Sequence, residues 1–226
     1  MFNSGGGSGR RTVHISHRTT QNIYRAIDYA TQIGRPLNRY VVIRIHGDSS
    51  GGGAAAPLML RKLARKFCNW LRRLKQTGRE DCPPIYTGII ENPPGKTAHV
   101  NWMVHVPHGR EKEFEKKLAM WARRILGNVN AGDIDAQPID ANTVKRLAKY
   151  VTKGTNPAYA RHFYLEDIIA DQGEVIGKRA GASVAIGNAA RKRADFRPPA
   201  RAHMYAPRRS TKAPKSKPAP PRVITT

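Results

Sequence analysis

Glu91, His99 and Asn101 stand in the stretch ENPPGKTAHVN, which has the composition of two strands joined by a turn. Alternate residues of a strand share a face, so His99 and Asn101 point the same way, with Cα atoms about 7 Å apart. A hairpin would bring Glu91 alongside His99. One carboxylate, one imidazole and one amide oxygen suit Mg²⁺ or Mn²⁺, which accept mixed ligands and retain water. The spacing therefore indicates a divalent-metal site, and the alternative is a plain polar strand surface.

A second group with chemical potential lies in KRLAKYVTKG. Tyr150 and Lys153 are three residues apart in an expected helix, and Arg146 precedes Tyr150 by four, so all three share a face. Nearby cations favour ionisation of a phenol, and a phenolate can act as a covalent nucleophile. Tyrosine beside lysine is also common on ordinary helices, so this pattern alone leaves catalysis and a structural role open.

The composition points to a polyanionic partner. The 226 residues include 40 Lys and Arg against 16 Asp and Glu, a net charge of +24. Such a charge repels itself unless a polyanion shares the surface, which favours nucleic acid. The sequence lacks both an apolar run of about 18 residues and a secretory signal. We therefore expect a cytoplasmic, nucleic-acid-associated protein with no membrane partner and with Cys68 and Cys82 as free thiols.

The elements that must position these groups follow from the hydrophobic periodicity. The pattern predicts an α+β fold, in which an antiparallel sheet of about five strands is flanked by helices. The expected strands are 39–47, 84–91, 98–106 and 133–139. The expected helices are 19–34, 57–76, 110–127 and 140–154.

Basic residues are concentrated on two of these helices and near the C-terminus. They surround the apolar stripe of helix 57–76, continue on helix 140–154 and recur as a run at 191–193. The residues expected to contact DNA phosphates are Arg61, Lys62, Arg65, Lys66, Arg72, Arg73, Arg146, Lys149, Arg191, Lys192 and Arg193.

The two chemical groups together are similar to a known arrangement. Glu-x7-His-x-Asn on a hairpin, followed about fifty residues later by Tyr-x-x-Lys on a helix, resembles the HUH endonucleases of rolling-circle replication. The order of elements over about 38–155 looks like that of plasmid and single-stranded-phage replication initiators. The resemblance implies a palm-like sheet similar to that of RNA-recognition domains. It also implies that Glu91, His99 and Asn101 bind the metal, Tyr150 is the nucleophile and Lys153 assists it.

Two departures from the family pattern define the expected enzyme. Asn101 stands where the family has a second histidine, and an amide oxygen is a weaker ligand than imidazole. Arg146 stands where two-tyrosine members carry a second tyrosine, so the chain resembles a one-tyrosine enzyme. The implied activity is nicking and rejoining of single-stranded or extruded origin DNA through a 5′-phosphotyrosine. The alternatives are an inactive or non-enzymatic DNA- or RNA-binding protein, and an HUH transposase or relaxase.

The resemblance also sets the expected organisation and partners. A flexible segment is expected at 1–18, a nuclease domain at 19–170, a glycine-rich basic extension at 171–194 and a disordered, proline-rich basic tail at 195–226. The sequence contains no Gly-x4-Gly-Lys-Ser/Thr loop. A host helicase and polymerase are therefore expected partners, and the resemblance implies a DNA-associated protein of a bacterial host cell.

Overall fold

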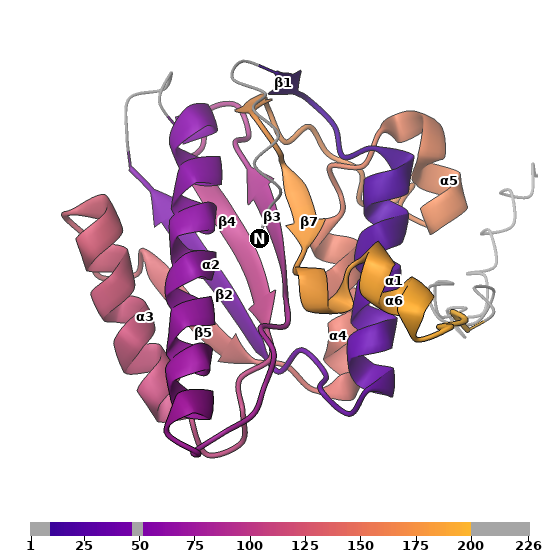
Figure 1. The fold of residues 1–226 in the computed structure, drawn as a ribbon. Coiled ribbons are helices and arrows are strands. Elements are labelled where there is room, and N and C mark those ends of the chain that lie inside the picture. Colours follow the sequence, from indigo (N-terminus) through magenta and orange to yellow (C-terminus); the bar gives the residue numbers. More distant parts are fainter. Residues whose placement is uncertain (1–9, 47–51, 200–226) are drawn as a thin grey trace, which may run out of the picture.

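The main sheet has five antiparallel strands in the order β5-β2-β4-β3-β7 (Figure 1). The computed structural model describes residues 10–46 and 52–199. The strands of this sheet are β2 (Arg39–Ile45), β3 (Tyr86–Glu91), β4 (Ala98–Val104), β5 (Ile134–Pro138) and β7 (Ala180–Ala182). A second sheet pairs β1 (Arg11–Thr12) with β6 (Val175–Ile176). The predicted α+β class and five-stranded antiparallel sheet are confirmed.

Four of the six helices were predicted, and these four match their predicted positions closely, with one exception. They are α1 (His17–Gln32), α2 (Gly52–Gln76), α3 (Glu111–Leu126), α4 (Ala141–Val151), α5 (Ala160–Phe163) and α6 (Asn188–Arg193). α2 begins at Gly52, before its predicted start at Pro57, because the alanines at 54–56 favour helix. Within the described residues, no helix is both long and apolar enough to cross a membrane.

Two hydrophobic layers lie on opposite faces of the sheet. Side chains alternate along β4, so Trp102 packs with α2 and α3, whereas Met103 packs with α1 and α4. The first layer is rich in aromatic rings, with Phe67 of α2 lying 5.4 Å from Trp102 between ring centroids. Figure 1 shows α2 and α3 together on one side of the sheet. This two-layer arrangement decides which residues can share a site.

The predicted boundary at 170 is wrong, because residues 171–194 complete the fold. β7 pairs with β3, with Ala180 opposite Ile89 and Ala182 opposite Thr87. Ala180 is buried in the layer formed with α1. The small residues of β7 lack the alternation of polar and apolar side chains that indicates a strand, so the sequence pattern predicted an extension.

The predicted flexible N-terminal segment is also wrong over residues 10–18. Arg11–Thr12 pairs with β6, and Ile15 is buried and bridges to Thr155. Residues 1–9 lie outside the described chain. Of the predicted tail, Phe196 packs on Tyr29 with ring centroids 5.2 Å apart, and residues 200–226 lie outside the described chain.

Candidate active site

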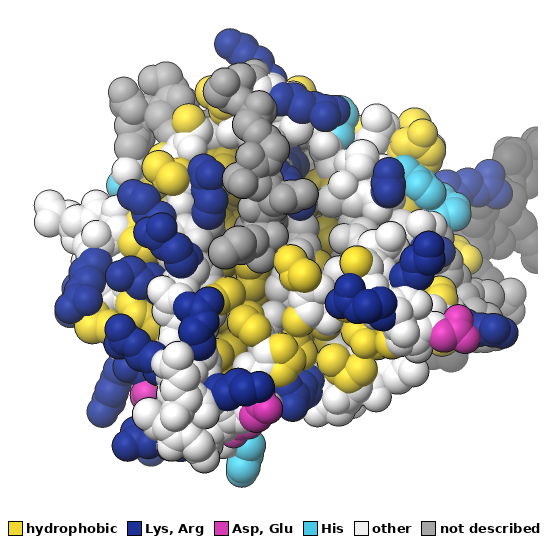
Figure 2. Space-filling model, viewed as in Figure 1, with side chains coloured by type: hydrophobic (Ala, Val, Ile, Leu, Met, Phe, Trp, Pro, Cys, Tyr) yellow, Lys and Arg dark blue, Asp and Glu magenta, His cyan; other side chains and the backbone are white. Residues whose placement is uncertain are grey.

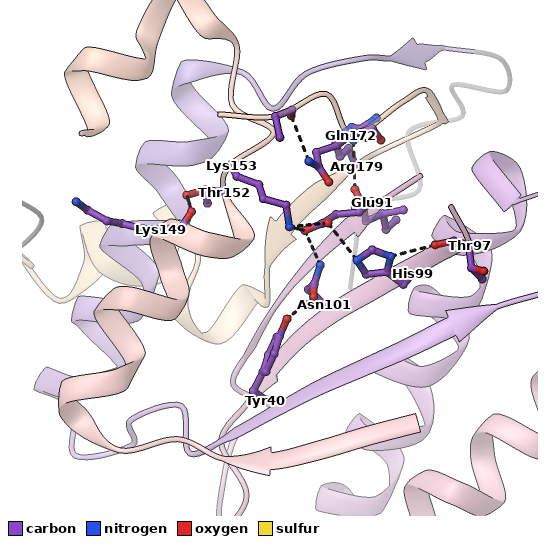
Figure 3. Close-up of polar contacts among 12 residues, drawn as sticks. Tyr40, Glu91, Thr97, His99, Asn101, Lys149, Thr152, Lys153, Gln172 and Arg179 are labelled. Carbon is purple, nitrogen blue, oxygen red and sulfur yellow. Dashed lines mark hydrogen bonds and ion pairs between the residues drawn. The ribbon is translucent and has the colours of Figure 1, made fainter. Parts of the chain in front are cut away.

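The β3–β4 hairpin brings the three predicted metal ligands together. Glu91 lies directly opposite His99 in the register, as predicted. His99 Nε2 is 3.1 Å from Glu91 Oε2, and Asn101 Nδ2 donates to Glu91 Oε1 at 2.8 Å (Figure 3). The three side chains therefore converge on one carboxylate.

Lys153 joins this group to the second predicted group. Its ammonium lies 2.7 Å from Glu91 Oε2 and 2.8 Å from Oε1, and 3.8 Å from the centroid of the Tyr150 ring. Tyr150 is 50% exposed, so a substrate can reach it. The structure thus places the expected nucleophile and the expected metal ligands on either side of one ammonium group.

The site is more enclosed than a solvent-facing strand would be. Glu91 is 2% and Asn101 is 1% exposed, because the turn that carries Lys153 lies over them. Burial alone would raise the pKa of Glu91. Hydrogen bonds from His99 and Lys153, with the positive charge of Lys153, outweigh burial and leave the pKa of Glu91 below its usual value. Glu91 is therefore ionised at neutral pH.

Tyr40 is a member of the site that the sequence did not reveal. Its hydroxyl donates to Asn101 Oδ1, from the neighbouring strand β2. Burial raises the pKa of Tyr40, and its proximity to Tyr150 and to the Glu91 carboxylate raises it further. Tyr40 is therefore a neutral hydrogen-bond donor that orients Asn101, in contrast to the exposed Tyr150.

The position of Lys153 is fixed by α1. α4 begins after Asp140, whose carboxylate accepts from two backbone N–H groups, and ends just before Lys153. Two pairs of buried hydroxyl groups then tie the following turn to α1: Tyr24 with Thr152 at 2.7 Å, and Thr20 with Thr155 at 2.8 Å. The turn is therefore held from both flanks of Lys153.

Arg179 fixes the end of β3 where the carboxylate is carried. This side chain is 3% exposed, and its guanidinium donates to the carbonyl oxygens of Thr12, Ile90, Gln172 and Gly173. Burial lowers the pKa of Arg179 to about 10, so the group stays charged at neutral pH. No sequence pattern signals this role, because the contacts join three separate segments of the chain.

Replacing Arg179 with methionine should destabilise the protein by about 3 kcal/mol or more, because several buried carbonyl oxygens would lose their donor. Urea unfolding followed by circular dichroism measures the change. Arg197→Met is the control, since among the described residues Arg197 forms only an exposed ion pair, and the change should alter stability by less than about 0.5 kcal/mol. Equal effects of the two substitutions would reject the clamping role of Arg179.

The donor atoms fit a divalent cation after three local changes. His99 Nε2 lies 3.1 Å from Glu91 Oε2, which can only accept, so this nitrogen donates and must lose its proton before it can bind a cation. His99 Nδ1 lies 3.2 Å from the carbonyl oxygen of Thr97, which is the usual orientation of a metal-binding histidine. Asn101 directs its nitrogen to Glu91 and its oxygen to Tyr40, so its amide must rotate to offer oxygen. The third change is the departure of Lys153 from Glu91.

Asn101 is therefore essential to a complete ligand set. Within residues 10–46 and 52–199, no three His, Cys, Asp or Glu side chains group closely enough to hold a metal ion. Glu91 and His99 supply only two ligands. The amide oxygen of Asn101 would have to be the third.

The predicted DNA-binding residues divide between the two faces of the sheet. Those on α2 lie on the face opposite the site, where Figure 2 shows Lys and Arg gathered over this helix with few acidic side chains. Of these, Arg61, Arg65, Arg72 and Arg73 are exposed, and Lys62 and Lys66 are half-buried. Arg146 and Lys149 lie on α4, on the site's side, and Lys149 points away from Glu91 (Figure 3). A single short strand of DNA cannot contact both sets.

The run at 191–193 is also divided. Lys192 and Arg193 are exposed, whereas Arg191 is 4% exposed and donates to Ile186 O and Asn22 Oδ1. Arg191 therefore stabilises the packing of α6 on α1. The prediction that Arg191 contacts DNA is not compatible with this burial.

Arg44 is a further cation of the site's face that the sequence did not reveal. It lies directly opposite His99 in the register of β2 and β4, and it alternates with the buried Ile43 and Ile45. Arg44 is exposed and donates to the carbonyl oxygen of Gly132. The sequence of this strand is typical of a β-branched core strand, so only the pairing register places Arg44 beside the predicted metal ligands.

A groove of about 850 Å³ runs along α2, away from this chemistry. Its lining includes Leu71, Tyr86 and both cysteines, and it contains no residue of the Glu91 group. Cys68 and Cys82 are unpaired, as predicted.

Comparison with models of known protein families finds no match, and comparison with curated proteins finds none either.

Proposed function

We propose that this protein nicks and rejoins single-stranded DNA at a replication origin, with Tyr150 as the nucleophile. The observation that carries the proposal is the position of Lys153, whose ammonium lies between the exposed Tyr150 ring and the buried Glu91 carboxylate. His99 and Asn101 contact the same carboxylate. A nucleophile and a ligand group are thus adjacent, although they lie far apart in the sequence.

The reaction is a transesterification. The phenolic oxygen of Tyr150 attacks the scissile phosphorus, and the bond from phosphorus to the 3′ oxygen breaks. The products are a 5′-phosphotyrosine and a 3′-hydroxyl, because the phenol loses its proton and the 3′ oxygen gains one. The phosphotyrosine retains the bond energy, so a later 3′-hydroxyl can reverse the step and rejoin the strand.

The surrounding residues have distinct roles. Lys153 stabilises negative charge on the phenolate and the phosphate. Tyr40 orients Asn101, and Arg44 lies where it can bind a phosphate next to the scissile one. A divalent Mg²⁺ or Mn²⁺ ion held by Glu91, His99 and Asn101 would supply Lewis-acid polarisation of the scissile phosphate.

The partners follow from the charge and from the chemistry. The net charge of +24 suits a polyanion, and attack by an exposed tyrosine requires DNA that is single-stranded or extruded. A host helicase and polymerase would then unwind and extend the 3′-hydroxyl. We place the protein in the cytoplasm of a bacterial host.

A pool of randomised single-stranded oligonucleotides tests the activity. The full chain is incubated with the pool in Mn²⁺ or in EDTA, and strands that stay attached in denaturing gels are sequenced. We expect adducts in Mn²⁺ that share a short motif and terminate at one position. No adduct in Mn²⁺ would reject nicking and favour a non-enzymatic nucleic-acid-binding protein.

The basic surface of α2 should contribute affinity without contributing to the chemistry. A variant with glutamine in place of four exposed α2 arginines should bind all DNA more weakly and flatten the plot of log affinity against log salt. The four are Arg61, Arg65, Arg72 and Arg73. Each lost phosphate contact should change this slope by about 0.7 to 0.9. Cleavage of a short oligonucleotide at saturation should be unchanged, because α2 lies on the other face of the sheet from Tyr150.

A control with the same change of net charge comes from α3. This control variant carries glutamine in place of four exposed α3 residues, Lys112, Lys116, Arg123 and Arg124. Fluorescence anisotropy over a range of salt compares the two variants. Equal slopes would show that α2 contributes only overall charge, and lost cleavage would show that α2 reaches the site.

A further inference from the structure

Every acceptor position of the Glu91 carboxylate is already used. Oε1 accepts from Asn101 Nδ2 at 2.8 Å and from Lys153 at 2.8 Å. Oε2 lies 3.1 Å from His99 Nε2 and 2.7 Å from Lys153. A carboxylate offers about four lone-pair sites, so four contacts leave none for a cation. A divalent ion can bind Glu91 only if one of these contacts is given up.

Lys153 is the contact that must leave. His99 can become a ligand by releasing its Nε2 proton, and Asn101 by turning its amide oxygen toward the cation, because each then offers a lone pair. An ammonium group has three donors and no acceptor. It also repels a second cation at the same oxygens, and the burial of Glu91 limits screening by water.

The structure provides a place to which the ammonium can move. Lys153 lies in the turn after α4, and its ammonium is already 3.8 Å from the centroid of the Tyr150 ring. Rotation about its side-chain bonds can carry the ammonium toward the exposed end of Tyr150 while the backbone stays held by α1.

We propose that Lys153 is the resident counterion of Glu91 and exchanges with the divalent cation, moving to Tyr150 as the cation binds. The inference rests on the proposed function and adds an order of events to it, in which cation binding precedes activation of the tyrosine. Without a cation, Lys153 neutralises Glu91 and is withheld from the nucleophile. With a cation, Lys153 is released to stabilise the phenolate, so the tyrosine is activated only when the ligand group is filled.

The exchange predicts that removal of Lys153 tightens metal binding. Lys153→Met should bind Mn²⁺ at least about tenfold more tightly than the wild type, because nothing then competes for Glu91. Lys153→Arg keeps a competing cation and should bind no more tightly than the wild type. Lys149→Met is the matched control, since it removes the same charge from a side chain that points away from Glu91 (Figure 3).

Calorimetric titration of the full chain with Mn²⁺ alone, without DNA, measures these affinities after circular dichroism has shown that each variant folds. The inference is overturned if Lys153→Met binds Mn²⁺ no more tightly than the wild type, if Lys149→Met gains as much, or if no variant binds. If Lys153→Met fails to fold, an NMR titration of the wild-type protein tests the exchange instead. The ¹⁵N resonance of the Lys153 ammonium must shift during a titration with Mg²⁺, whereas that of Lys149 must not, and an unmoved Lys153 signal rejects exchange.

These outcomes are separable from those of the nicking experiment. Adducts on Tyr150 with unchanged Mn²⁺ affinity in Lys153→Met would retain nicking and reject exchange. Tighter Mn²⁺ binding in Lys153→Met without adducts in the wild type would retain exchange and reject nicking.

Discussion

Tyr150→Phe should eliminate covalent protein–DNA adducts while leaving DNA binding nearly intact. The substitution deletes one hydroxyl from a half-exposed side chain, so packing and the contact between Lys153 and Glu91 should persist. Phenylalanine has no oxygen to attack phosphorus, and removal of a covalent nucleophile lowers rates by about a thousandfold or more. Denaturing gels with labelled oligonucleotides measure the adducts, and anisotropy should show an affinity within about twofold of the wild type.

Two other exposed tyrosines serve as controls. Tyr159 and Tyr164 are 42% and 39% exposed, and neither contacts Lys153 or Glu91 among the interactions of the described residues. Phenylalanine at either position should leave adduct formation unchanged. Adducts that persist in Tyr150→Phe and map to Tyr159 or Tyr164 would show that the nucleophile is assigned wrongly.

His99→Ala should abolish both cleavage and measurable Mn²⁺ binding. The substitution removes the imidazole that lies against Glu91, and two oxygen ligands alone hold Mn²⁺ weakly in competition with Lys153. Asn101→His should have the opposite effect on affinity and tighten Mn²⁺ binding by about tenfold, because imidazole is the stronger ligand for this ion. Calorimetry reports both affinities.

His105→Ala controls for the loss of a histidine from the same chain segment. His105 lies beyond the end of β4 and contacts the carbonyl oxygen of Pro36 through Nδ1, so cleavage should be retained. If the wild type binds no Mn²⁺ and Asn101→His gains none, then this strand does not form a metal site.

Local patterns were sufficient to predict the parts of the site that one hairpin and one helix supply. The turn after Glu91 fixes the register, so the pairing of Glu91 with His99 followed from the sequence. The alternation of side chains along β4 likewise predicted that Trp102 and Asn101 lie on opposite faces of the sheet. Both inferences depend on neighbours within about a dozen residues, where strand geometry leaves few choices.

Contacts between distant segments could not be predicted in this way. Lys153 and Glu91 are 62 residues apart, and their ion pair exists only because α1 and α4 pack on the same face of the sheet. The sequence shows that α2 is amphipathic but not which face of the sheet it covers, so its arginines were grouped with Arg146. Arg179 was missed for the same reason, since its four carbonyl partners meet only after β7 has joined the sheet.

The antiparallel pairing of β1 with β6 and of β7 with β3 also governs when a newly made chain can act. The strand that carries Glu91 gains its outer neighbour only after residues 180–182 have been synthesised, and Arg10–Thr12 must wait for a partner near 175–177. A ribosome-bound chain that has emerged only to residue 170 already contains every proposed catalytic residue but lacks Arg179. We therefore expect nicking activity to arise only after residues 175–182 have left the ribosome and joined the sheets.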